Sequence, residues 1–130
     1  DTDRRNEAFD PMFYGSDDWG RWGIGDIGSF SLSNTNERAI MGEVGFAPTE
    51  TTMLRAQYFY ITLDRPLEAI YPEVGKRWSH EANVIFDYYP NDWFFGGAEL
   101  GWSEPLNAAE AYSGGDNNAL EFVLWAGVDF

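Results

Sequence analysis

The sequence predicts an all-β fold: an antiparallel transmembrane β-barrel segment in which about six up-and-down strands form an open curved sheet, part of a larger barrel. Three observations lead to this prediction. Apolar residues alternate with other residues in several segments, long apolar runs are missing, and short turns alternate with long connections. All three features are typical of strands that cross a bilayer, which takes about 9 to 11 tilted residues.

The last stretch of the chain, residues 118–130, shows the alternation most clearly. Counted back from Phe130, every second residue is apolar, down to Leu120, and the intervening set includes Glu121 and Asp129. A period of two indicates a strand. An apolar outer face, acids on the other face and a terminal aromatic are typical of the closing strand of an outer-membrane barrel. We therefore expect outer-membrane lipid as a partner, and the barrel-assembly machinery as a partner of this strand.

Composition excludes several other classes. The chain has 130 residues, of which 44% are hydrophobic and 18% aromatic, without a run that approaches 18 consecutive apolar residues, so the sequence predicts no membrane-spanning helix. There are 22 acidic residues against 8 Lys and Arg, a formal net charge of −14. Phosphate groups would be repelled by such a chain, so we expect no nucleic-acid partner.

The predicted elements follow in chain order. Residues 1–20 are expected to form a loop that follows a missing upstream strand, and residues 21–130 the C-terminal six strands of the barrel. The predicted strands are 21–32, 38–47, 52–63, 78–89, 93–103 and 118–130. The connections 48–51 and 90–92 are short turns, whereas 64–77 and 104–117 are long, the second with a helical turn at 106–112 and a reversal at Gly114-Gly115. Short periplasmic turns and long outer loops would place the C-terminus in the periplasm of a Gram-negative bacterium.

Strand alternation separates two sets of candidate residues. If the apolar faces meet lipid, the opposite faces line a water-filled lumen that favours cations; alternatively, these acids pair with basic residues on missing strands or on an inserted loop. The predicted pore-lining residues are Glu43, Arg55, Gln57, Glu81, Asn83, Asp87, Glu99, Glu121 and Asp129. The predicted aromatic girdles are Phe46, Tyr88, Phe94 and Phe130 at the periplasmic ends and Trp78 and Trp102 at the outer ends.

Motifs for chemistry are weak. Residues 23–28 match G-x-G-x-x-G, but strand-like residues follow where a dinucleotide site needs a helix. His80 is the only histidine, and its neighbours Ser79 and Glu81 point to the opposite side of a strand, so no catalytic triad is expected. The acidic loops around Asp17-Asp18 and 114–118 do not fit EF-hand spacing. We therefore expect no enzyme activity, no cofactor and no metal site.

Several segments resemble the C-terminal part of the alginate-export family of outer-membrane porins. They are Phe9 to Gly15, Trp19 to Trp22, Asn34 to Asn36, Pro48 to Glu50, Tyr58 to Asp64, Asn83 to Asp92 and Glu104 to Tyr112. The resemblance implies a large single-chain barrel that lets a polysaccharide or other solute pass. Family members that pass the polyanion alginate are expected to line the constriction with Arg and Lys, whereas only Arg55 faces the interior here, which argues against alginate itself.

The expected function is thus passive passage of small solutes or polysaccharide through a polar, largely acidic lumen. The alternative is a soluble, secreted β-sandwich that binds carbohydrate through Trp19, Trp22, Trp93 and Trp102. It predicts polar outer faces on at least half of the strands. A small barrel enzyme is a further alternative, but it would need a nucleophile and a base that converge, and a single His80 argues against it.

Overall fold

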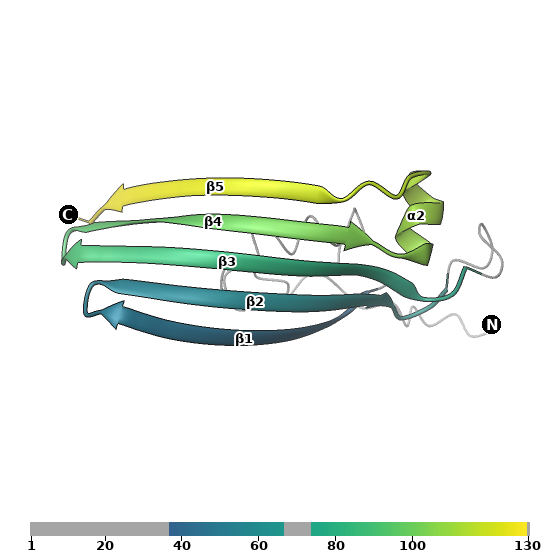
Figure 1. The fold of residues 1–130 in the computed structure, drawn as a ribbon, viewed down its shortest axis with the longest axis horizontal. Helices are drawn as coiled ribbons and strands as arrows, with labels where there is room; N and C mark the ends of the chain where they lie inside the picture. Colours follow the sequence, from purple (N-terminus) through teal and green to yellow (C-terminus); the bar gives the residue numbers. More distant parts are fainter. Residues whose placement is uncertain (1–36, 67–73, 130) are drawn as a thin grey trace, which may run out of the picture.

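A computed structural model describes residues 37–66 and 74–129 as one open antiparallel sheet with a short helix at one end (Figure 1). The strand order is β1-β2-β3-β4-β5, so each strand pairs with its neighbours in sequence. The elements are β1 (Glu37–Thr49), β2 (Thr52–Leu63), β3 (Arg77–Asn91), β4 (Phe94–Pro105), α2 (Asn107–Ser113) and β5 (Ala119–Val128). None of the described helices is long and apolar enough to cross a membrane.

The strands predicted from residue 38 onward are confirmed, and so is the helical turn predicted at 106–112. β1 and β3 extend a few residues beyond the predicted bounds. The expected loop 1–20, the expected strand 21–32 and Phe130 lie outside the described residues. The all-β, up-and-down architecture is therefore established for the described part as five strands in one sheet.

Short turns join the strands at one end of the sheet, and hydrogen bonds from side chains stabilise these turns. Asn91 Oδ1 accepts hydrogen bonds from the backbone N–H groups of Trp93 (3.2 Å) and Phe94 (2.9 Å), an Asx turn that starts β4. Thr49 and Thr52 hydroxyls bond across the β1–β2 turn at 2.7 Å. α2, in the connection between β4 and β5, lies at the opposite end, and β5 runs back toward the short turns (Figure 1).

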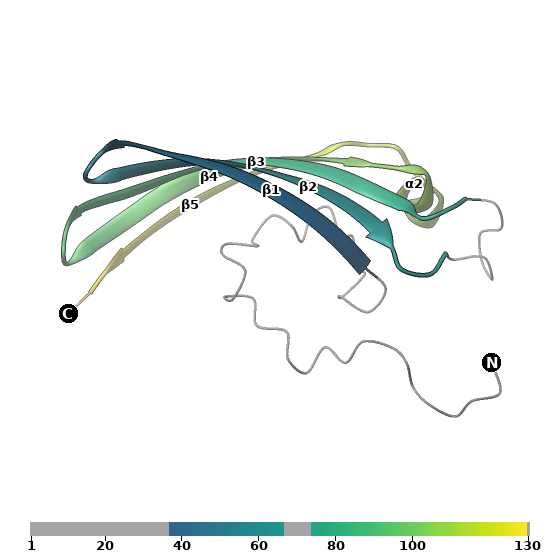
Figure 2. The same ribbon diagram turned by 90° about the horizontal axis from the view of Figure 1, so that it is seen from below.

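The sheet arches along its length, so it has a convex and a concave face, and α2 lies at the end of the concave face (Figure 2). Ala108 and Ala109 on α2 belong to a buried cluster with Phe59, Ile61, Leu63 and Trp78, against which Val74 packs. The helix ends at Gly114, whose φ of 73° is left-handed and suits glycine. This cluster lies at one end of the sheet, and Ile85, which is also 0% exposed, lies outside it.

A bulge on β3 places Trp78 in this cluster. Ile61 pairs with Ser79 and Thr62 with Arg77, so Trp78 is the extra residue between two pairs. An extra residue shifts the alternation by one position, which turns the indole inward. Its side chain is 0% exposed and lies 5.7 Å from the ring of Tyr112 on α2.

Near the short turns, two aromatic rings cover glycines on the concave face. Trp125 lies over its partner Gly97, and Phe95 lies over its partner Gly127, a reciprocal arrangement between β4 and β5. A Cβ atom at Gly97 would overlap the indole of Trp125 and the backbone carbonyl oxygen of Phe86 on β3. Glycine at this position therefore lets the ring and the neighbouring strand approach closely.

We expect Gly97→Ala to destabilise the fold by about 1–3 kcal/mol, the usual cost of overpacking, because the Phe86 carbonyl cannot yield without disturbing β3. The measurement is urea unfolding of the purified protein. Gly42→Ala is the matched control, since a Cβ there meets nothing within 4 Å. Equal effects of the two substitutions would contradict the close packing of Trp125 on Gly97.

Candidate functional site: the polar face of the sheet

The strand register sorts the side chains into two rows of opposite character. Directly opposite residues in an antiparallel sheet share a face. One row across the sheet reads Glu43, Gln57, Asn83, Gly101, Glu121, and the next row reads Val44, Ala56, Val84, Leu100, Phe122. These two rows, one polar and one apolar, therefore face opposite sides of the sheet.

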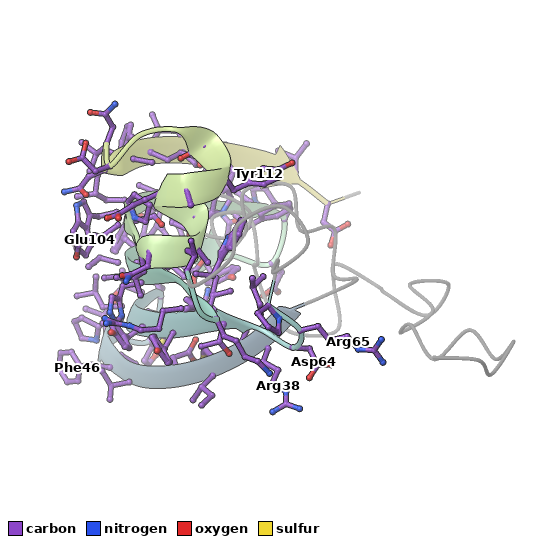
Figure 3. All side chains as sticks on the ribbon, turned by 90° about the vertical axis from the view of Figure 1, so that its right-hand side faces the viewer. Arg38, Phe46, Asp64, Arg65, Glu104 and Tyr112 are labelled. Atoms are coloured by element: carbon purple, nitrogen blue, oxygen red, sulfur yellow. The ribbon has the colours of Figure 1, made fainter. Side chains whose placement is uncertain are left out.

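The convex face is apolar and exposed across all five strands. Phe46 points outward from it in Figure 3. Its large exposed side chains are Ile40, Val44, Phe46, Leu54, Tyr58, Val84, Phe86, Tyr88, Leu100, Leu120, Phe122, Leu124 and Val128. A continuous apolar surface of this kind is rare on soluble monomers and marks contact with lipid or with a protein partner.

The concave face carries the residues that the sequence predicts as pore-lining, and it holds most of them out of solvent. Gln57, Glu81, Asn83, Asp87 and Glu99 are buried, Arg55 and Glu121 are half-buried, and Glu43 is exposed. The strand register brings these eight side chains to one face of the sheet. Asp129 follows the end of β5 and is exposed, and its backbone N–H donates to the carbonyl oxygen of Trp93 at 2.9 Å.

A salt bridge links two of these residues. Arg55 Nη2 lies 2.6 Å from Asp87 Oδ2, with side-chain exposures of 19% and 3%. Asp87 lies two residues along β3 from Ile85, the direct partner of Arg55, and is therefore on the same face as Arg55. Burial of a carboxylate requires such a partner, because the charge is otherwise transferred out of water without compensation.

Two amides bind neighbouring carboxylates on the same face. Gln57 Nε2 donates to Glu43 Oε2 at 2.6 Å, and Asn83 Nδ2 donates to Glu81 Oε1 at 2.9 Å. Gln57 and Asn83 are themselves directly opposite each other in the β2–β3 ladder. Carboxylates and amides thus form a connected polar surface over β1, β2 and β3.

The residues predicted to form the aromatic girdles differ in burial, and one of them does not lie on the outer face. Phe46 and Tyr88 are exposed on the convex face near the short turns, where Phe94 is half-buried, and Trp102 is half-buried nearer the other end. Trp78 does not lie on the outer face; the bulge buries it in the core beside α2. The girdle assignment of the others stays a prediction.

Sequence reasoning missed a cluster around His80 on the convex face. Its Nδ1 is hydrogen-bonded to the hydroxyl of Tyr58, and its ring lies 5.1 Å from that of Tyr60. His80 is directly opposite Tyr60 on β2 and Glu104 on β4. The sequence alternation places Tyr58 and Tyr60 on one face of β2. Only the strand register shows that His80 on β3 contacts both of them.

No group of three or more His, Cys, Asp or Glu side chains in residues 37–66 and 74–129 is arranged to hold a metal ion. The 114–118 loop lies within this part, whereas the 17–18 loop and the glycine motif at 23–28 lie outside it. No family model matches the chain, and no curated protein or solved structure matches it either.

Proposed function

We propose that the chain is a segment of an outer-membrane β-barrel porin, through which small solutes pass along a polar, largely acidic lumen. The observation that carries this proposal is the inverted distribution of side chains: apolar residues are exposed on the convex face, and charged residues lie on the concave face. A soluble sheet buries its apolar face, whereas a barrel in lipid exposes it.

Strand length and connection length support the same proposal. The strands contain 10 to 15 residues, as many as or more than the roughly 9 to 11 that cross a bilayer at a tilt. Short turns at one end and long connections at the other suit the periplasmic and outer sides of such a barrel, with the C-terminus in the periplasm. Both edge strands, β1 and β5, lack a partner on one side among the described residues and would pair with further strands.

The charge of the concave face favours cations as the permeating species. Glu43 and Glu121 lie on the two edge strands in one row and are within reach of solvent. The only described cation on that face is Arg55, and it is bound to Asp87. A ring of acids beside an aqueous path lowers the energy of cations there and raises that of anions.

A soluble carbohydrate-binding β-sandwich is less compatible with these features. A sandwich needs a second sheet on the apolar face of the first, and the described residues form one sheet whose apolar face is exposed on every strand. Of the tryptophans that this alternative uses, Trp93 is exposed at a turn and Trp102 is half-buried on the convex face. Trp93 and Trp102 lie near opposite ends of β4 and so do not form one platform, and Trp19 and Trp22 lie outside the described residues.

Planar-bilayer recording of the full-length protein tests the proposal. We expect stable ohmic openings and a reversal potential under a KCl gradient that shows cation preference. Glu43→Gln and Glu121→Gln should each reduce the cation-to-anion permeability ratio, by about twofold for one removed charge in a water-filled pore. Ser103→Ala is the control, because this buried side chain on the same face is uncharged and donates to the His80 carbonyl oxygen.

Folded, inserted protein without any conductance would overturn the open-porin proposal. Anion preference would overturn the acidic lumen, and it would restore the polyanion alginate as a candidate solute, as the family resemblance suggests. The alginate-export family itself stays a prediction from sequence.

A further inference from the structure

We infer that Gln57 and Asn83 form the centre of a weak binding site for a partly dehydrated monovalent cation on the concave face. This inference rests on the proposed channel and specifies what its lumen binds. The evidence is a pair of buried amide oxygens that accept no hydrogen bond, with the carboxylate of Glu43 beside them in the same row of the sheet.

The orientation of both amides follows from their partners. Carboxylate oxygens accept hydrogen bonds, so the nitrogens of Gln57 and Asn83 must face Glu43 and Glu81, and the carbonyl oxygens must face away. In the described part of the chain, Gln57 Oε1 and Asn83 Oδ1 have no hydrogen-bond donor. The two side chains are only 5% and 1% exposed. A buried acceptor without a donor destabilises the folded state, so a ligand with positive charge is favoured there.

Both oxygens belong to one place on the sheet. Gln57 and Asn83 are directly opposite each other, and Cβ atoms of such pairs are about 4.5–5.5 Å apart. Glu43 on β1 is directly opposite Gln57, whereas Glu121 on β5 lies further along the same row, with Gly101 between it and Asn83. Amide and carboxylate oxygens together are the ligand type of hard cations.

The same row explains why the ion is monovalent and weakly held. Tight divalent sites need several carboxylates at one point, and in residues 37–66 and 74–129 no three acids meet in this way. Two amide oxygens with carboxylates at the side replace part of the hydration shell of K⁺ or Na⁺ without trapping it. Permeation requires sites of this strength, because an ion must enter and leave quickly.

The test compares the wild type with Gln57→Met/Asn83→Leu, which removes both amide oxygens and changes no charge. In planar bilayers we expect wild-type conductance to saturate with rising KCl concentration. The double variant should need about fivefold more KCl for half-saturation, or stay linear, because two ligands are lost. Ser103→Ala should behave as the wild type, since its row lies beside the site and its hydroxyl is satisfied by the His80 carbonyl oxygen.

A second measurement does not depend on conduction. Thermal unfolding of the full-length protein in detergent is recorded in KCl and in choline chloride of equal ionic strength. A ligand that binds only the folded state raises the Tm, so K⁺ should stabilise the wild type and choline should not. In the double variant, where it folds, this difference should disappear.

The two measurements separate the site from the channel. Saturating conductance with K⁺-specific stabilisation supports both, and K⁺-specific stabilisation without conductance supports the site but overturns the channel. Linear conductance with equal Tm values in the two salts overturns the cation site and leaves the porin proposal intact.

Discussion

Val84→Arg is expected to destabilise the protein by about 2–4 kcal/mol in a lipid bilayer, the cost of a charged side chain at the middle of a barrel's lipid face. Val84 lies near the middle of β3 on the convex face and is 54% exposed. Its lateral neighbours Ala56 and Leu100 are apolar, so no carboxylate is available to pair with the new guanidinium. The measurement is urea unfolding of the full-length protein inserted in phospholipid vesicles.

Val128→Arg provides the matched control. Val128 lies on the same face but at the short-turn end of β5, where it pairs with Phe94 and is 47% exposed. Near the membrane interface an arginine costs only about 0–1 kcal/mol. If both substitutions stay within about 0.5 kcal/mol, as on an exposed surface in water, the convex face does not contact lipid, and the membrane proposal is wrong.

The sequence predicts this convex face well because alternation is a local property. Successive strand residues point to opposite sides whatever the neighbouring strand is, so a period of two identifies an apolar face on each strand, and Val84, Leu100 and Leu124 fall on these apolar faces. The bounds of β2 agree with the predicted 52–63. At β3 the prediction stops at residue 89, whereas the strand continues to Asn91, whose pairing with Phe94 around the turn extends it.

Trp78 shows where a local pattern fails. Counted back from Val84 in steps of two, it falls on the outer face, and the sequence therefore predicts it in a girdle. The bulge between the Thr62–Arg77 and Ile61–Ser79 pairs reverses that phase. A bulge depends on how two strands align and on the space beside α2, and neither is visible in the β3 sequence.

The sequence predicts which residues lie on the polar face, but not which hydrogen bonds they form with one another. Alternation places Gln57 and Asn83 on the inner face, but it does not tell that Gln57 donates to Glu43 or that Asn83 donates to Glu81. The Gln57–Glu43 contact depends on the register of β1 against β2, which a shift of one residue would destroy. The unmet amide oxygens follow from these contacts, so they too appear only in the folded chain.

Arg55→Met is expected to destabilise the fold by about 3 kcal/mol, the lower end of the cost of breaking a buried salt bridge. Asp87 is 3% exposed, and without the guanidinium at 2.6 Å its charge stays buried with less compensation. The lower end applies because Asp87 has a further interaction besides this one. Methionine keeps most of the side-chain volume, so the loss reports on charge rather than on packing. The measurement is urea unfolding of the full-length protein in detergent.

Arg38→Met is the control, because it breaks a salt bridge of similar length that is open to solvent. Arg38 and Asp64 are 2.7 Å apart, with side chains 73% and 46% exposed, and both lie at the β1 edge in Figure 3. Exposed pairs contribute about 0–1 kcal/mol. The variant Arg55→Met/Asp87→Asn should recover part of the stability lost in Arg55→Met, because the buried charge is removed together with its partner. Equal losses in Arg55→Met and Arg38→Met would mean that Asp87 is as accessible to water as the exposed Arg38–Asp64 pair. That result would contradict the burial of the Arg55–Asp87 salt bridge.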